Sequence, residues 1–196
     1  MQTKFFDTVV DKLVENGYIV LDNALDEKLL ENLFLLSQND NNYRKAGISS
    51  SDNFHLDSSK RSDKTMWIDE DASFQSDYLS FCNELKEYLN RTLYLGLNYY
   101  ESHFAIYEKG DFYEKHLDAF RGSKNRIVTT VLYLNEEWTE NDGGELVIYD
   151  EDDKQITKVI PKRGTLVIFL SDKFPHEVLP TNKKRHSIAG WFRVDT

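Results

Sequence analysis

The sequence contains one cysteine, Cys82, among its 196 residues, so no disulfide can form within the chain. A disulfide framework and a zinc site built from several thiolates are both excluded, which suits a reducing cytoplasm. No apolar run approaches the roughly 20 residues that a membrane-spanning helix needs. The first residues, Met1–Asp7, already carry charge and lack the apolar core of a signal peptide. We therefore expect a cytoplasmic protein that is neither secreted nor inserted in a membrane.

Positive charge is also in short supply, with 24 basic side chains against 34 acidic ones and a net charge of −10. This balance opposes binding to phosphate backbones, so nucleic acid is not an expected ligand, whereas a basic protein partner is compatible with it. Hydrophobic residues make up 40% of the chain and aromatic residues 13%, which is enough to form a sizeable core. We expect a folded chain whose oligomeric state the sequence does not indicate.

Residues 1–95 are predicted to be mainly helical. Apolar side chains recur there at helical spacing in three segments, each of which is expected to pack one face against a sheet. These faces are Phe5, Val9, Leu13 and Val14; Leu29, Leu30, Leu33 and Leu36; and Tyr78, Phe81, Leu85 and Leu89. Gly17 ends the first helix, a strand follows at Tyr18–Leu21, and Asp26 can cap the second helix. The third helix is expected over about 76–91.

Two stretches of the chain do not follow this helical pattern. From residue 38 to about 63, Asn, Asp, Ser and Gly dominate, which predicts a long flexible surface loop or flap. After Leu97, short β-rich runs alternate with turn residues. The runs are Tyr99–Tyr107, Phe112–Leu117, Ile127–Leu134, Glu145–Tyr149, Thr165–Leu170, Glu177–Leu179 and Ser187–Val194. We predict an α+β fold in a single domain, 1–196, whose amino-terminal helices buttress an antiparallel jelly-roll core, a double-stranded β-helix, over 96–196.

The most informative motif is His116-Leu117-Asp118, which is followed later in the chain by His176. Alternate side chains of an extended segment point to the same side, so His116 and Asp118 converge and one strand end can deliver two ligands. His176 follows a strand-like run and can approach from a different strand. Two imidazoles and one carboxylate on one face of a divalent metal leave the opposite face open, an arrangement that indicates a non-haem Fe(II) oxygenase.

Arg185 adds a second element to this constellation. It lies across the connection 180–184 from His176, so we expect it on an adjoining antiparallel strand. A guanidinium can hold a carboxylate through two parallel hydrogen bonds, a geometry that lysine matches poorly. Arg185 is therefore predicted to anchor an acidic co-substrate.

Three other histidines compete for these roles. His55-Leu56-Asp57 repeats the ligand tripeptide, but it lies in the irregular segment, which is a poor mounting for a metal site. His103 is interpreted as a satisfied, partly buried imidazole in a strand. His186 neighbours Arg185 and should point to the opposite side of a regular strand. None of the three is assigned to the metal.

These residues resemble the prolyl 4-hydroxylase branch of the 2-oxoglutarate and Fe(II)-dependent dioxygenases, in particular its HIF-type and bacterial members. The likeness covers about the last hundred residues. Segments similar to that family are Arg126–Asn135, Trp138, Gly143–Leu146, and Pro175–Pro180 with Arg185 and Trp191 downstream. Residues 62–68 are similar to a shorter family element before the core. The flap equivalent, residues 39–60, is rich in Ser and Asn and does not align with the family segment that grips peptide.

The resemblance implies a role for each matched residue. His116, Asp118 and His176 would bind Fe(II), Arg185 would pair with the distal carboxylate of 2-oxoglutarate, and Tyr133 would hydrogen-bond the same carboxylate. Further implied contacts are Tyr107 near the co-substrate, Trp191 in the active-site wall and Arg126 close to the substrate channel. The implied reaction uses O2 and hydroxylates a C–H bond, releasing succinate and CO2, with ascorbate as the reductant. The leading substrate is a prolyl residue in a protein or peptide.

Several alternatives stay open. A free amino acid or another small molecule could be the substrate of the same chemistry, because fold-level likeness does not fix function. A zinc hydrolase is possible because His and Asp also bind Zn²⁺, although it would lack an evident glutamate base and leave Arg185 without a task. A jelly-roll binding module, whose metal is absent or structural, is the third possibility.

Overall fold

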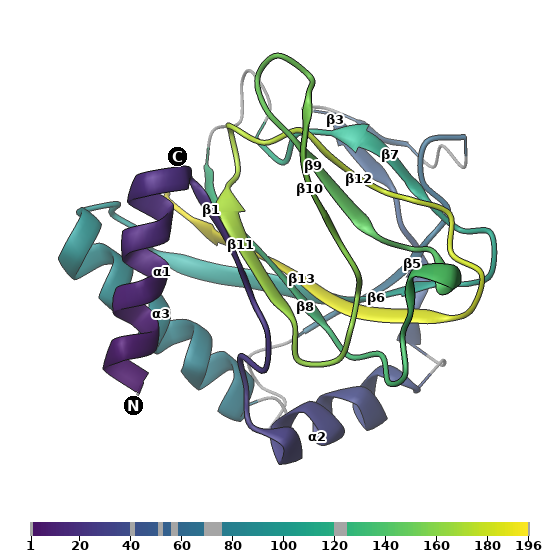
Figure 1. Cartoon of the computed structure of the whole chain (residues 1–196), viewed down its shortest axis with the longest axis horizontal. Helices are drawn as coiled ribbons and strands as arrows, with labels where there is room; N and C mark the ends of the chain where they lie inside the picture. Colours follow the sequence, from purple (N-terminus) through teal and green to yellow (C-terminus); the bar gives the residue numbers. More distant parts are fainter. Residues whose placement is uncertain are drawn as a thin grey trace.

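The computed structural model describes residues 2–39, 42–50, 53–55, 59–68, 76–119 and 125–195. Figure 1 shows the arrangement of the elements. In chain order they are α1 (Gln2–Asn16), β1 (Tyr18–Leu21), α2 (Glu27–Ser37), β2 (Arg44–Lys45), β3 (Ile48–Ser50), β4 (Asn53–His55), β5 (Lys64–Trp67), α3 (Ser76–Leu93), β6 (Tyr99–Tyr107), β7 (Tyr113–His116), β8 (Arg126–Tyr133), the short 3-10 helix η3 (Glu140–Asp142), β9 (Leu146–Tyr149), β10 (Gln155–Val159), β11 (Leu166–Leu170), β12 (His176–Val178) and β13 (Arg185–Arg193).

Two antiparallel sheets form the body of the structure. One is seven-stranded in the order β1-β11-β8-β13-β6-β5-β2, and the other is four-stranded in the order β10-β9-β12-β7. The strands β3 and β4 form a separate two-stranded antiparallel sheet. Helices combined with two antiparallel sheets confirm the predicted α+β fold with a jelly-roll core.

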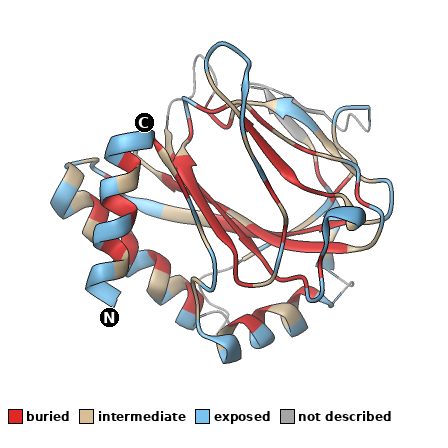
Figure 2. Ribbon diagram, in the orientation of Figure 1, coloured by how far each residue is buried: buried red, intermediate tan, exposed pale blue. Residues whose placement is uncertain are grey.

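The long strands β6, β8 and β13 separate two apolar cores. Because alternate side chains of a strand face opposite ways, Phe104, Leu132 and Ile188 join a core with the helices, whereas Tyr107 and Tyr133 join a core between the two sheets. Figure 2 shows these strands buried along most of their length. The inner face of the seven-stranded sheet is thus the surface that a site between the sheets can use.

The helices α1, α2 and α3 cover the outer face of the seven-stranded sheet (Figure 1). In α1 the buried residues are Phe6, Val9, Val10 and Leu13. The buried face of α1 is therefore rotated from the predicted one, since Phe5 is only partly buried and Val14 is 69% exposed. Asp26 caps α2 as predicted, accepting a hydrogen bond from the Lys28 amide at 2.9 Å. Among the described helices, none is long and apolar enough to cross a membrane.

The described part of the predicted loop over residues 38–63 includes three short strands that the sequence analysis did not predict. The strands β2, β3 and β4 lie within it, and β2 extends the seven-stranded sheet beyond β5. These strands are only two or three residues long, and most of their residues are polar, so alternation of apolar side chains could not reveal them. The strand β10 was also missed, because its burial pattern is mostly exposed.

Gly190, in the middle of β13, is packed against the ring of Tyr100 so closely that an added Cβ would overlap the ring. The Tyr100 hydroxyl is fixed by hydrogen bonds to the hydroxyls of Tyr78 and Thr130, both at 2.8 Å, and cannot withdraw freely. We expect Gly190→Ala to lower the free energy of unfolding by about 1–3 kcal/mol, measured by urea denaturation. The same change in a Tyr100→Leu background should cost less, and an equal cost would contradict this explanation.

Candidate active site

The sheet pairing of β7 with β12 brings two histidines together. His116 ends β7, His176 begins β12, and the two residues lie directly opposite each other in the antiparallel ladder. Asp118 follows two residues after His116, just beyond the strand end, and is buried. The predicted convergence of the three side chains is what the structure shows.

The ligand atoms of these residues surround one small volume. Each of His116, Asp118 and His176 offers an atom, and all three atoms lie within 4.8 Å of one another. The Nε2 atom of His116 lies 3.7 Å from Asp118 Oδ1, and the Nε2 atom of His176 lies 3.6 Å from Asp118 Oδ2. Within the described ranges, this is the group of His, Cys, Asp and Glu side chains that could hold a metal ion.

Backbone carbonyls orient both imidazoles. His116 Nδ1 lies 2.7 Å from the carbonyl oxygen of Glu114, and His176 Nδ1 lies 2.9 Å from that of Phe174. A carbonyl can only accept, so each Nδ1 carries the proton and each Nε2 keeps its lone pair. This second contact is the usual way in which a metal-binding histidine is fixed in tautomer and direction.

The ionisation states also suit a cation. Burial, together with the neighbouring His176, lowers the pKa of His116 to about 3, so its imidazole is neutral at neutral pH. Burial opposes ionisation of Asp118, but the adjacent His176 and His116 outweigh that effect and lower its pKa. Imidazole nitrogens and a carboxylate are donors that ferrous iron accepts, so these residues fit the metal that the sequence indicates.

Thr129 and Ser171 complete the surroundings of Asp118, although the sequence analysis did not find them. The Thr129 hydroxyl donates to Asp118 Oδ2 at 2.8 Å and lies 2.9 Å from the Ser171 hydroxyl. Thr129 stands on the inner face of β8, where small polar residues are indistinguishable by pattern from ordinary strand residues. These bonds hold the carboxylate in one orientation beside the histidines.

Arg185 lies in the other sheet, on β13, and not on a strand that adjoins β12 as predicted. The connection after β12 crosses from the four-stranded to the seven-stranded sheet, so Arg185 faces the space between the sheets. Its guanidinium carbon lies 4.8 Å from the Tyr107 ring centre and 5.0 Å from that of Tyr133. The structure therefore brings Arg185, Tyr107 and Tyr133 together.

Arg185 is a buried cation with unused hydrogen-bonding capacity. Its side chain is almost fully buried, and it donates from Nη1 to the Ser187 hydroxyl at 3.1 Å. Over the described residues, no carboxylate forms a salt bridge with it, and its Nε and the Tyr133 hydroxyl have no hydrogen-bond partner. Burial raises the pKa of Tyr133 to about 12, so its phenol remains a donor. A buried cation beside a free phenol is suited to an anionic ligand.

Trp191 and Arg126 form a separate part of the wall. The Arg126 guanidinium lies over the Trp191 ring at 3.8 Å and is held by Glu101 at 3.1 Å. The same Glu101 also pairs with Arg193 at 2.6 Å. Arg126 is thus already partnered, which distinguishes it from Arg185.

The remaining histidines have different outcomes. His186 points away from Arg185 as predicted, because its ring contacts Phe34 and its Nδ1 lies 2.9 Å from the Ser37 hydroxyl. His103 is 5% exposed, its ring contacts those of Trp67 and Trp191, and its Nδ1 has no hydrogen-bond partner among the described residues, so the prediction of a satisfied, partly buried ring was wrong. His55 belongs to β4, whereas residues 56 and 57 of that tripeptide lie outside the described residues.

Comparisons with known proteins agree with this geometry. Residues 102–193 match the family described as the 2OG-Fe(II) oxygenase superfamily. The structure is similar to a prolyl-4-hydroxylase from Pseudomonas putida, with a TM-score of 0.88 and 36% identity over 97% of this chain and 100% of that one. It is also similar to a prolyl hydroxylase from Trichoplax adhaerens solved with a hypoxia inducible factor peptide, with a TM-score of 0.86 and 27% identity over 98% and 90% of the two chains.

Curated sequences show a shorter likeness. The prolyl 3-hydroxylase sudestada1 of Drosophila melanogaster is 30% identical over 128 residues, which are 58% of this chain and 23% of that protein. The chain thus spans about a quarter or less of the length of the curated relatives it matches.

The burial of His103 leads to a pH prediction for the metal-free protein. Burial lowers the pKa of His103 to about 3, whereas an unfolded histidine titrates near 6.5. Below about pH 6.5 the unfolded chain therefore binds an extra proton, and folding stability is lost as the pH falls toward about 3. Between about pH 7 and about pH 5, wild type should lose about 2 kcal/mol more free energy of unfolding than His103→Met. Equal losses in urea denaturation would contradict the buried, neutral state of His103.

Proposed function

We propose, since this chain belongs to the 2OG-Fe(II) oxygenase superfamily, that it hydroxylates a prolyl residue of a protein or peptide with 2-oxoglutarate and O2 as co-substrates. The observation that carries this proposal is that the two sheets present two different features to the space between them. One sheet presents the triad His116, Asp118 and His176, and the facing sheet presents the buried Arg185, which has no carboxylate partner among the described residues. A metal triad opposite an anion anchor is what an iron enzyme with an acidic co-substrate requires.

The triad is the proposed site for Fe(II). These three side chains would hold the ion and would leave its remaining coordination positions to the co-substrates. When bound, Fe(II) supplies the redox chemistry that couples oxidative decarboxylation of 2-oxoglutarate to hydroxylation of a C–H bond, with succinate and CO2 as products. The chain's own contribution is to keep both Nε2 lone pairs and the Asp118 carboxylate directed at one point.

Arg185 and Tyr133 are the proposed anchor for 2-oxoglutarate. The Arg185 fork offers two parallel donors to the distal carboxylate, and the Tyr133 hydroxyl offers a third. Tyr107, whose ring centre lies 4.8 Å from the guanidinium carbon, would line the same site near the co-substrate. Ser187 holds one end of the fork, so the guanidinium is oriented before the ligand arrives.

The proposed substrate is a peptidyl proline. Similarity to the Pseudomonas and Trichoplax prolyl hydroxylases over nearly the whole chain supports this choice over a free amino acid. Trp191 and Arg126 would line the approach to the metal, the indole as an apolar wall and the guanidinium as a donor to peptide carbonyls. Ascorbate, as the reductant that restores Fe(II), belongs to the same proposal.

The rival classes have less support. A zinc hydrolase would leave the buried cation Arg185 without a role, and a binding module would need neither the triad nor the anchor. Both would lack succinate production in any assay with 2-oxoglutarate and O2.

Substitution of Asp118 by alanine tests the metal assignment. The change removes the carboxylate donor, so 2-oxoglutarate-dependent gain of one oxygen atom by a proline-containing peptide should fall below detection. The measurement is mass spectrometry of the peptide, with succinate followed in parallel. Asp152→Ala, in an exposed turn, is the matched control and should retain full activity. Iron-dependent turnover by Asp118→Ala would show that the ligand set is wrong, and oxygen gain on free amino acids alone would reject the peptidyl substrate.

Arg185→Lys tests the co-substrate anchor. Lysine keeps the charge but loses the second parallel hydrogen bond, which for a charged pair is worth about 1.5–3 kcal/mol. The KM for 2-oxoglutarate should rise by about 10- to 100-fold, while the KM for peptide should change little. Arg163→Lys is the control, because that guanidinium pairs with Glu27 and Glu31 instead. An unchanged KM for 2-oxoglutarate in Arg185→Lys would place the anchor elsewhere.

A further inference from the structure

Tyr113 lies between a proposed metal ligand and a cation. Its ring is stacked on the His116 imidazole, with 3.6 Å between ring centres and 15° between ring planes. The Arg61 guanidinium carbon lies 4.2 Å from the centre of the same Tyr113 ring. The near-parallel imidazole covers one face of the phenol, and one face has room for one planar group, so the guanidinium occupies the opposite face. The three groups form a stack in the order Arg61, Tyr113, His116.

Arg61 is itself held rigidly. Its Nε and Nη2 donate to the two oxygens of Asp63 at 2.8 Å and 2.7 Å, and Nη1 donates to the Gly47 carbonyl at 3.3 Å. Asp63 is 1% exposed, and the Arg61 side chain is 12% exposed. A bidentate pair with a buried carboxylate fixes the plane of the guanidinium as well as its position. Arg61 therefore presents a fixed flat surface to Tyr113.

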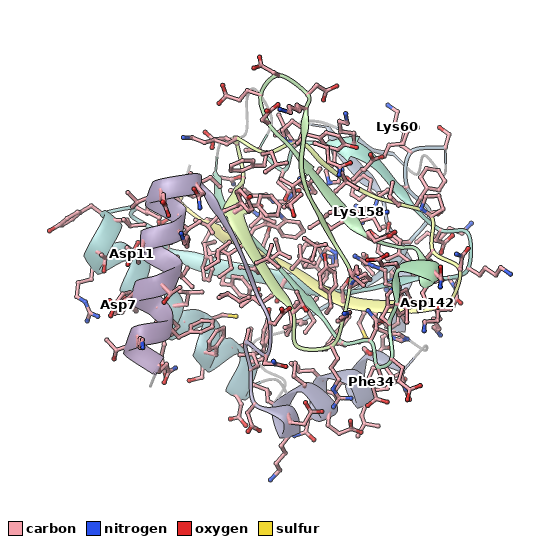
Figure 3. All side chains as sticks on the ribbon, in the orientation of Figure 1. Asp7, Asp11, Phe34, Lys60, Asp142 and Lys158 are labelled. Atoms are coloured by element: carbon pink, nitrogen blue, oxygen red, sulfur yellow. The ribbon has the colours of Figure 1, made fainter. Side chains whose placement is uncertain are left out.

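The backbone around the stack is also tied together. Arg61 forms an isolated antiparallel bridge with Tyr113, and the Glu114 amide donates to the Lys60 carbonyl at 2.8 Å. Lys60, labelled in Figure 3, marks this segment beside β7. The Phe112 amide donates to the Ser62 hydroxyl at 3.1 Å. The segment 60–62 is thus joined to the strand that carries His116, although it lies far from it in sequence.

His116 needs such support because its hydrogen bond fixes only one atom of the ring. The bond from Nδ1 to the Glu114 carbonyl sets the tautomer but still allows the ring to tilt about that contact. A flat neighbour at 3.6 Å restricts the tilt and so fixes the direction of the Nε2 lone pair. His176 has a different neighbour, the ring of Phe169, at 4.8 Å between ring centres and 66° between ring planes, so the two histidines are supported in different ways.

We propose that Arg61 is a positioning residue for the metal ligand His116 and that it acts through the ring of Tyr113. The inference rests on the proposed function, because it takes His116 to be a metal ligand. Asp63 fixes Arg61, and Arg61 packs on one face of the Tyr113 ring. The opposite face of that ring packs on the His116 imidazole and holds its plane. Loss of any member allows the His116 ring to tilt, and the metal is then bound more weakly and in an altered geometry.

The test measures Co(II) binding to the metal-free full chain by titration, with the visible absorption spectrum of bound Co(II) recorded in parallel. Tyr113→Phe keeps the ring and should bind Co(II) like wild type with the same spectrum. Tyr113→Leu and Arg61→Met should each weaken Co(II) affinity by about 10- to 100-fold and change the spectrum. The double variant should bind no more weakly than Tyr113→Leu alone, because Arg61 acts through the ring that this variant lacks.

Controls separate positioning from general damage. Arg91→Met removes the guanidinium that lies 4.9 Å over Tyr88 on α3 and should leave Co(II) affinity unchanged. Arg61→Lys replaces Arg61→Met if the latter does not fold. It keeps the charge beside Asp63 but lacks a flat face, so it should also weaken Co(II) affinity and change the spectrum. Circular dichroism and thermal unfolding of each metal-free variant report on folding itself.

The outcomes are distinct. Absence of Co(II) binding by wild type would reject the proposed metal site, and with it the proposed function. If wild type binds Co(II), and both Tyr113→Leu and Arg61→Lys bind it with unchanged affinity and spectrum, the positioning role alone is overturned. A raised KM for peptide with unchanged Co(II) affinity in the Arg61 variants would also overturn it, because Arg61 would then act on the substrate.

Discussion

The direct opposition of His116 and His176 in the ladder between β7 and β12 is the constraint on which the candidate site depends. Side chains of paired residues project to the same face of a sheet, so this register places both imidazoles on one side without any loop having to close over them. A slip of one residue would send one ring to the other face. The β9 strand on the far side of β12 pairs His176 with Ile148 and so holds the register from both edges.

The buried charge of Arg185 is a second constraint, because it lowers the stability of the fold. A cation removed from water destabilises a fold unless something compensates for it, and within the described residues only Ser187 is bonded to it. The aromatic faces of Tyr107 and Tyr133 offset part of this cost. The well-packed core that the helices form on the outer face of the same sheet offsets the rest of this cost. Under the proposed function, the protein thus keeps a buried cation ready for an anionic ligand, at a cost in stability that the other core offsets.

The sequence could predict the parts of this structure that repeat or that carry rare chemistry. The triad, Arg185, the helices and most of the β-rich runs follow from spacing, alternation and the scarcity of such motifs. The sheet that Arg185 belongs to could not be predicted, because a short connection can either turn back within one sheet or cross to the other. Thr129, Ser171 and the stack of Arg61 on Tyr113 were missed for a related reason. Their roles come from tertiary neighbours, and nothing in their own spacing marks them.

The proposed metal ligands and the proposed carboxylate anchor belong to different sheets, and a shared apolar layer keeps those sheets apart. Val131, Ile148 and Phe169 belong to that layer, and none of them carries a group that could touch a ligand through a hydrogen bond. The thickness of this layer would set the separation between the proposed metal and the Arg185 guanidinium, and hence the length of dicarboxylic acid that could span both. Under the proposed function, selectivity for the length of the acid would depend on these core residues, which offer the acid no hydrogen bond.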